Sequence, residues 1–157
     1  MPSLEYLGLL GSLSDVGSLL GVGRYHYDDV PDNTLRNLLE SLRELQNLTQ
    51  LDLAPASELG LGFDGGSPCG NAYYGPGGRE YSRQVDKEWA EAVERGTAIV
   101  IQTLPQLESF NIGEQSPSLT RYDNGTIQAT FPWTGRLDEW AWEATPEPDN
   151  DDPYHWE

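Results

Sequence analysis

Apolar residues recur along the chain in three short phrases that share one spacing. The phrases are LEYLGL (4–9), LTQLDL (48–53) and LESFNI (107–112). In each phrase an apolar residue is followed by two others, then by an apolar residue, one other and a last apolar residue. The second half of each phrase alternates apolar and variable positions, as a strand with one buried face must. The pattern therefore predicts three short strands.

Two amphipathic helices are predicted, and a strand phrase follows each of them directly. The first covers residues 33–45, where leucines recur at the spacing of one helix face. The second covers residues 82–103, carries Val85, Trp89 and Val93 on one stripe, and is stopped by Pro105. An order in which helices and strands alternate favours parallel strands with crossover helices, which is an α/β fold.

Two further tracts interrupt this order. Glycine and proline are concentrated in residues 54–81, which we predict to be an inserted surface loop or a partly ordered flap. Its candidate anchors are Phe63, Tyr73 and Tyr74. Residues 143–157 are dense in acids and prolines and poor in aliphatic residues, so we expect a disordered acidic tail after a single domain over residues 1–142.

A β-hairpin is predicted near the carboxyl end of the domain. Asp123-Asn124-Gly125 lies between the strand-like stretches 119–122 and 126–131, and Asn-Gly favours tight hairpin turns because both residues tolerate positive φ. An aromatic group follows the hairpin, made up of Phe131, Trp133, Trp140 and Trp142. We expect the hairpin and the tryptophans to form a cap over the end of the stacked strands.

The net charge limits the kinds of partner that the chain can bind, and the cysteine content bears on its location. The chain has 157 residues, with 9 basic and 26 acidic ones, for a net charge of −17. Such a surface repels phosphate backbones and anionic membranes, so we expect neither nucleic acid nor a membrane as a partner. The single cysteine, Cys69, excludes an intrachain disulfide and favours an intracellular location, in the cytoplasm or the nucleus.

Three groups of residues suggest chemistry, and each has a simpler structural interpretation. Residues 60–65 form a literal G-x-G-x-x-G, but Gly66 and Pro68 follow where a nucleotide-binding helix would begin. Cys69 has no histidine that the sequence places beside it, since His26 and His155 are remote. The acids Asp28, Asp29 and Asp32 suit a turn before a helix better than a calcium loop. We therefore expect no catalytic residue, no metal site and no cofactor.

The three phrases resemble the leucine-rich repeat signature L-x-x-L-x-L. The arrangement is similar to the irregular repeats of fungal F-box-type leucine-rich repeat proteins, and the ending TRYDNGTIQATFPWTGRLDEWAWE resembles the close of those chains. The asparagine or cysteine that usually follows the third leucine is missing, and no F-box is visible. The resemblance covers residues 1–142. It implies a short, irregular solenoid with parallel strands, convex-side helices and a hairpin cap, as the carboxy-terminal portion of a longer chain.

The resemblance also implies a function and a binding surface. Positions between the leucines face outward on the concave sheet of the repeat, and this concave face corresponds here to Tyr6, Gln50, Asp52, Ser109, Asn111 and Glu114. The implied role is a non-enzymatic protein-protein interaction module, such as substrate recognition in an F-box-type ubiquitin ligase. Alternatives are a solvated face without a partner, a small enzyme whose pocket is lidded by the glycine-rich loop, and a truncated fragment without independent function. Self-association is predicted through the uncovered strand edge at 4–9.

Overall fold

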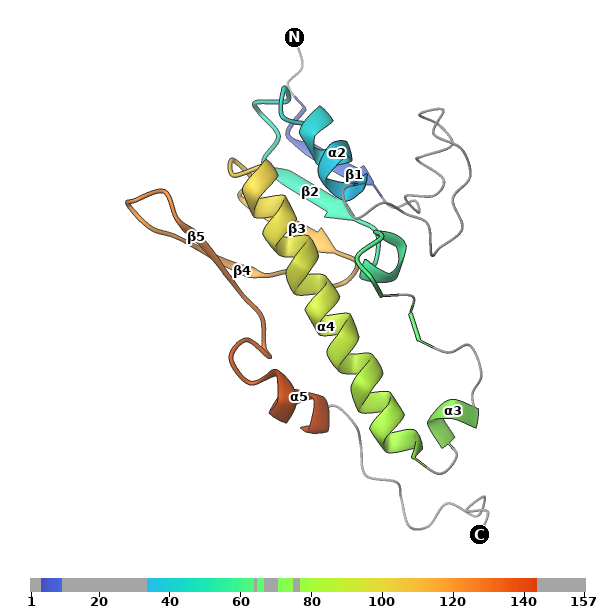
Figure 1. Ribbon diagram of the computed structural model, residues 1–157. Helices are drawn as coiled ribbons and strands as arrows, with labels where there is room; N and C mark the ends of the chain where they lie inside the picture. The colour runs from blue at the N-terminus through green and yellow to red at the C-terminus, as the bar shows by residue number, and fades with distance from the viewer. Residues whose placement is uncertain (1–3, 10–33, 64, 67–70, 75–76, 144–157) are drawn as a thin grey trace, which may run out of the picture.

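The computed structural model describes residues 4–9, 34–63, 65–66, 71–74 and 77–143 (Figure 1). Several sequence-based expectations fall outside these ranges: those for most of the acidic tail, for Cys69, for both histidines and for the aspartates at 28, 29 and 32. They stay predictions.

The three leucine phrases form a parallel sheet. Strands β1 (Tyr6–Leu9), β2 (Gln50–Leu53) and β3 (Ser109–Ile112) lie in the order β1-β2-β3. Their central apolar residues are in register, with Leu7 beside Leu51 and Leu51 beside Phe110. The prediction of three parallel strands joined by helical crossovers is confirmed, and the fold is mixed α/β.

The same pair of backbone hydrogen bonds joins each strand to the next at its amino-terminal end. The amides of Thr49 and Gln50 both donate to the carbonyl of Glu5, over 2.9 and 3.0 Å. One strand further on, the amides of Glu108 and Ser109 donate in the same way to the carbonyl of Thr49, over 2.8 and 3.2 Å. Positions 5, 49 and 108 are therefore equivalent, although the lengths of chain between them differ. The difference in length lies in the connections between the strands, so the hydrogen bonding of the sheet is regular.

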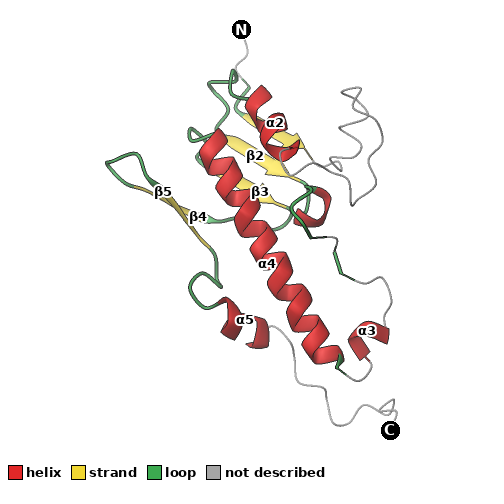
Figure 2. Ribbon diagram, in the orientation of Figure 1, coloured by secondary structure: helices red, strands yellow, loops and turns green. Residues whose placement is uncertain are grey.

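Helices α2 (Thr34–Ser41) and α4 (Gly78–Thr103) cover the same face of the sheet (Figures 1 and 2). Helix α2 is shorter than the predicted 33–45, because hydrogen-bonded turns replace the helix after Ser41. Helix α4 begins four residues before the predicted Ser82. The last residues of the glycine-rich tract are thus helical, and its predicted loop boundary at 81 is wrong.

The core lies between the two helices and the sheet. Its strand residues and the helix residues that face them are all at most 3% exposed: Leu35, Leu39, Leu51, Leu53, Val93, Val100, Phe110 and Ile112. At Gly96 the helix α4 packs closely on this layer, since a Cβ there would lie 2.9 Å from the Cδ1 atoms of both Leu61 and Ile112. A side chain at this position would force the Leu61 and Ile112 side chains to shift.

The glycine-rich tract is anchored to α4 over the part that is described. After the short helix η2 (Ala56–Glu58), both Leu61 and Phe63 are buried. The guanidinium of Arg95 donates two hydrogen bonds to the Leu61 carbonyl, over 3.0 and 2.7 Å. These contacts hold the described part of the tract against α4.

Helix α3 (Asn71–Tyr74) continues the tract and packs on the start of α4. The ring of Tyr73 meets that of Tyr81 edge-on, with centroids 5.1 Å apart. Tyr74, in contrast, is 91% exposed, so the expectation that it anchors the tract is wrong.

The predicted hairpin is present as β4 (Ser118–Arg121) and β5 (Ile127–Thr130). Gly125 has a φ of 83° in its turn, a value that favours glycine. The guanidinium of Arg121 donates to the carbonyls of Pro105 and Leu107, which precede β3. The hairpin is therefore attached on the β3 side of the sheet, the last strand of the three.

An aromatic cluster then fastens the carboxyl end of the domain to α4. Trp133 is 1% exposed, and its ring lies 5.2 Å from that of Trp89 and 5.0 Å from that of Trp140 on helix α5 (Leu137–Glu143). Lys87 on α4 pairs with Asp138 on α5 over 2.7 Å. Phe131, Trp133 and Trp140 of the predicted group are found together against α4, the hairpin is held to the segment before β3, and the side chain of Trp142 lies outside the described part of the structure.

Neighbouring substitutions on β2 test the alternation of its faces. We expect Leu51→Ala to lower the free energy of unfolding by about 2–5 kcal/mol, because Leu51 is fully buried. We expect Gln50→Ala, one residue away on the exposed face, to change it by less than about 0.5 kcal/mol. Urea unfolding followed by circular dichroism measures both. Similar losses of unfolding free energy for the two variants would contradict this alternation of buried and exposed residues along β2.

Candidate functional site

Burial of the leucines places a row of polar side chains on the opposite face of the sheet. This surface, called here the polar face, consists of Tyr6, Gln50, Asp52, Ser109 and Asn111. Two rows run across the strands: Tyr6, Gln50 and Ser109 lie side by side, as do Gly8, Asp52 and Asn111. Tyr6 is 53% exposed, and Asp52 and Asn111 are half-buried between their neighbours.

Hydrogen bonds between side chains connect the three strands across the polar face. The Tyr6 hydroxyl donates to Oδ2 of Asp52 over 2.8 Å, and Nδ2 of Asn111 donates to Oδ1 of Asp52 over 2.6 Å. Ser116, beyond the end of β3, donates its hydroxyl to Oδ1 of Asn111. Both carboxylate oxygens of Asp52 are thus held in place from the strands on either side.

Gly8 makes room for the first of these bonds. Tyr6 lies diagonally across from Asp52, so its ring must pass over the position beside Asp52 on β1, which is Gly8. A Cβ at Gly8 would lie 3.2 Å from the Tyr6 hydroxyl oxygen, tighter than most contacts of that kind. A larger side chain there would displace the ring, so glycine is the residue that suits this arrangement.

The carboxylate of Asp52 changes the acidity of Tyr6. It accepts the phenolic hydrogen bond and its negative charge opposes the phenolate, and both effects raise the pKa of Tyr6 above its ordinary value of 10.0. Desolvation of the hydroxyl adds to the rise in pKa. The phenol therefore stays protonated, and keeps donating to Asp52, throughout the physiological pH range.

The predicted site residues are partly brought together. Tyr6, Asp52 and Asn111 are in direct contact, and Gln50 and Ser109 lie exposed in the neighbouring row. Glu114 lies outside this group, exposed in the turn that follows β3. Sequence reasoning missed Ser116, which reaches Asn111 only because that turn is closed by paired hydrogen bonds between Ile112 and Gln115. Nothing in the spacing of apolar and polar residues predicts that the turn brings Ser116 back to Asn111.

The G-x-G-x-x-G stretch serves as structural connection in the described part of the chain. Gly60, Gly62 and Gly65 have φ of 64°, 78° and 92°, which is turn geometry and not the start of a helix. Between them, Leu61 points its side chain into the core and its carbonyl toward Arg95. These contacts favour a structural turn and disfavour a nucleotide-binding loop.

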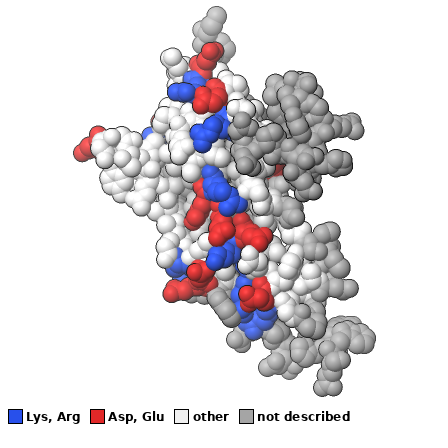
Figure 3. All heavy atoms as spheres, in the orientation of Figure 1, with Lys and Arg blue, Asp and Glu red and all other residues white. Residues whose placement is uncertain are grey.

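Acidic and basic side chains alternate over the α4 side of the molecule (Figure 3). Pairs such as Arg83 with Glu80 at 3.2 Å belong to this mixed surface. Among the described residues, no three His, Cys, Asp or Glu side chains gather as a metal site would require. Over the same ranges, no helix has both the length and the apolar character of a membrane span.

Comparison of the chain with protein-family models, with curated proteins and with solved structures found no match.

Removal of the Asp52 charge tests the electrostatics of the polar face. We expect Asp52→Asn to lower the pKa of Tyr6 toward 10.0, because the amide no longer opposes the phenolate. Because the folded-state pKa is raised, the contact stabilises the fold below pH 10 and this contribution is lost as the pH rises through the pKa of Tyr6. NMR titration of the tyrosine Cζ resonances measures the shift.

Asp123→Asn, in the hairpin turn, is the matched control and should leave the pKa of Tyr6 unchanged. The same pKa of Tyr6 in wild type and Asp52→Asn would show that the Tyr6–Asp52 contact is absent in solution.

Proposed function

We propose that this chain is a non-enzymatic protein-interaction module that binds a protein partner through the polar face. The observation that carries the proposal is the position of Asp52, whose two carboxylate oxygens are held by Tyr6 and Asn111 on an exposed sheet surface. A surface whose groups are already oriented loses less conformational entropy on binding. Hydrogen bonds to a charged carboxylate from both sides also fix the direction in which Asp52 faces solvent.

The chemistry of the surface favours a polar partner with a basic patch. Tyrosine, asparagine, serine and glutamine side chains make adaptable contacts at protein interfaces, and Tyr6 supplies the large aromatic surface. Asp52 and Glu114, in the turn that follows β3, are acidic, and the whole chain carries a net charge of −17. Complementary charge speeds association and selects partners, so lysine or arginine side chains are expected opposite Asp52.

The proposal extends to a leucine-rich-repeat-like unit that recognises substrates for an F-box-type ubiquitin ligase in the cytoplasm or nucleus. The three parallel strands in one register, with helices on the other face, support the repeat-like interpretation. The ligase role rests on the resemblance of the sequence, and fold alone does not specify function. Each part of the proposal therefore has its own experiment.

Charge reversal tests the surface. Wild type, the double variant Asp52→Lys/Glu114→Lys and the control Asp123→Lys are each used to capture proteins from the cells that express the gene. We expect a set of proteins that wild type and the control retain and the double variant loses, because like charges then face the basic patch. Circular dichroism confirms that each variant is folded. Retention of every captured protein by the double variant would contradict the polar face as the binding surface.

The ligase role makes a separate prediction about the captured proteins. A substrate for degradation should increase in abundance when the gene is deleted, and the increase should be reversed by wild type and not by Asp52→Lys/Glu114→Lys. Unchanged abundance of every captured protein would refute the ligase role and leave the interaction surface standing.

A further inference from the structure

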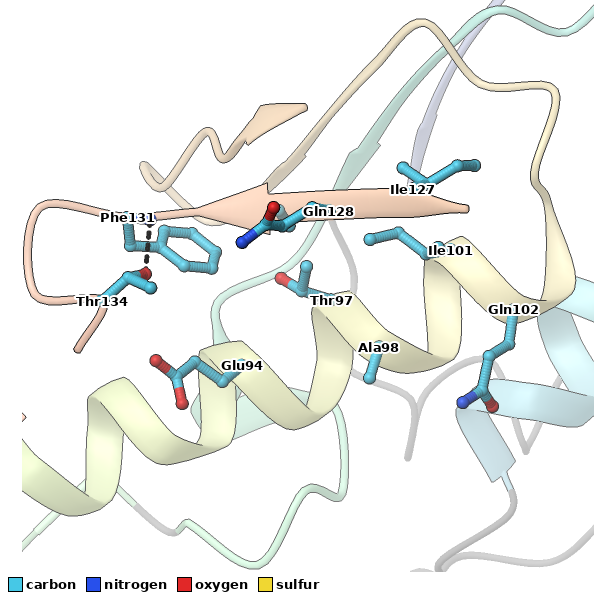
Figure 4. A pocket seen from close by; sticks show the side chains of 10 residues that line it. Glu94, Thr97, Ala98, Ile101, Gln102, Ile127, Gln128, Phe131 and Thr134 are labelled. Carbon is cyan, nitrogen blue, oxygen red and sulfur yellow. Dashed lines mark hydrogen bonds between the residues drawn. The ribbon is translucent and has the colours of Figure 1, made fainter. Parts of the chain in front are cut away.

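A groove lies between α4 and β5, away from the polar face (Figure 4). Its volume is about 520 Å³, within the range of small-molecule sites. One wall is a stripe of α4, and the other is formed by β5 and the chain that follows it. The lining residues are Glu94, Thr97, Ala98, Ile101, Gln102, Ile127, Gln128, Ala129, Phe131 and Thr134.

Thr97 is the unusual member of this lining. It is 3% exposed, and its hydroxyl has no hydrogen-bond partner. Figure 4 shows its side chain on the side of α4 that faces β5. A buried hydroxyl without a partner is destabilising, and a helical threonine commonly avoids this by bonding to the carbonyl one turn earlier. The hydroxyl is therefore in place for a polar atom that enters the groove.

Glu94 lies three residues before Thr97, so the two side chains are neighbours along one side of α4. The indole nitrogen of Trp133 donates to Oε1 of Glu94 over 3.0 Å and holds the carboxylate at the end of the groove. Trp133 also supports the apolar wall, since its ring stacks on that of Phe131 with centroids 4.7 Å apart. Carboxylate, hydroxyl and apolar surface are thus arranged along a single groove.

We propose that this groove binds a small organic cation with a flat apolar body, such as an arylalkyl amine. The ammonium group donates to the Thr97 hydroxyl oxygen and to the Glu94 carboxylate, at the end where Phe131 lies, while the ring extends along the groove against Ile101 and Ile127. An anion would face Glu94 and the net charge of −17, and a plain hydrocarbon would leave the Thr97 hydroxyl without a partner. The site does not depend on the function proposed for the polar face.

Tryptamine is the probe for this site, and methyl NMR of isotope-labelled isoleucine and threonine is the readout. We expect saturable shifts for the methyl groups that line the groove, those of Thr97, Ile101 and Ile127. The methyl groups of Ile99 and Ile112, which are not among the lining residues, serve as internal references. Indole-3-acetate, with the same ring and the opposite charge, should produce no saturable shift.

Two threonine variants separate binding from folding. Thr97→Val replaces the hydroxyl with a methyl group, and we expect tryptamine affinity to fall about tenfold with the loss of one hydrogen bond to a charged group. Thr103→Val is the matched control: Thr103 is on the same helix, is 2% exposed and also has an unpartnered hydroxyl, but lines a different hollow. It should leave the affinity unchanged, while both variants raise the melting temperature of the ligand-free protein.

Glu94→Gln keeps an acceptor for Trp133 and removes the charge. It should weaken tryptamine binding and leave the fold intact. The proposal is overturned if no saturable shift appears at Thr97, Ile101 and Ile127, which would mean that the groove holds water alone. Equal loss of affinity in Thr97→Val and Thr103→Val would also overturn it, as would equal binding of indole-3-acetate.

Discussion

The close packing of α4 on the leucine layer is the interaction on which the rest of the structure depends. At Gly96 the helix approaches the side chains of Leu61 and Ile112 so closely that a Cβ would collide with both. The same helix also meets α2, α3, η2, α5 and β3, so five of the nine other described elements pack on one 26-residue segment. Parallel strands of four residues cannot hold a sheet together alone, and a long helix across them supplies the missing apolar surface.

The polar face follows from that packing. Because side chains alternate along a strand, burial of Leu51 and Leu53 under the helices forces Gln50 and Asp52 to the other side. The parallel register then brings Asn111 beside Asp52, and the absence of a side chain at Gly8 admits the ring of Tyr6. The hydrogen-bonded row is thus a consequence of leucine spacing combined with a few residues between the leucines.

The local pattern was sufficient to predict that the strands, the helices α2 and α4 and the hairpin exist, because each depends on neighbours along the chain, but it placed the end of α2 four residues too late. It failed at the start of α4, where Gly77 and Gly78 read as loop but the packing of Tyr73 on Tyr81 draws the helix back to Gly78. The groove between α4 and β5 could not be predicted from the sequence either. Thr97 lies in a plain helical stretch, and the groove it lines exists only because the long-range fold places β5 opposite α4.

The two candidate sites are separate, and a single stretch of chain connects them. Residues 113–117 leave β3 beside Asn111, carry Glu114 and Ser116, and lead into the hairpin whose second strand walls the groove. Arg121 holds the other strand of the hairpin to the carbonyls before β3. A displacement of the turn that follows β3 would therefore move both Ser116, which binds Asn111, and the hairpin that forms one wall of the groove.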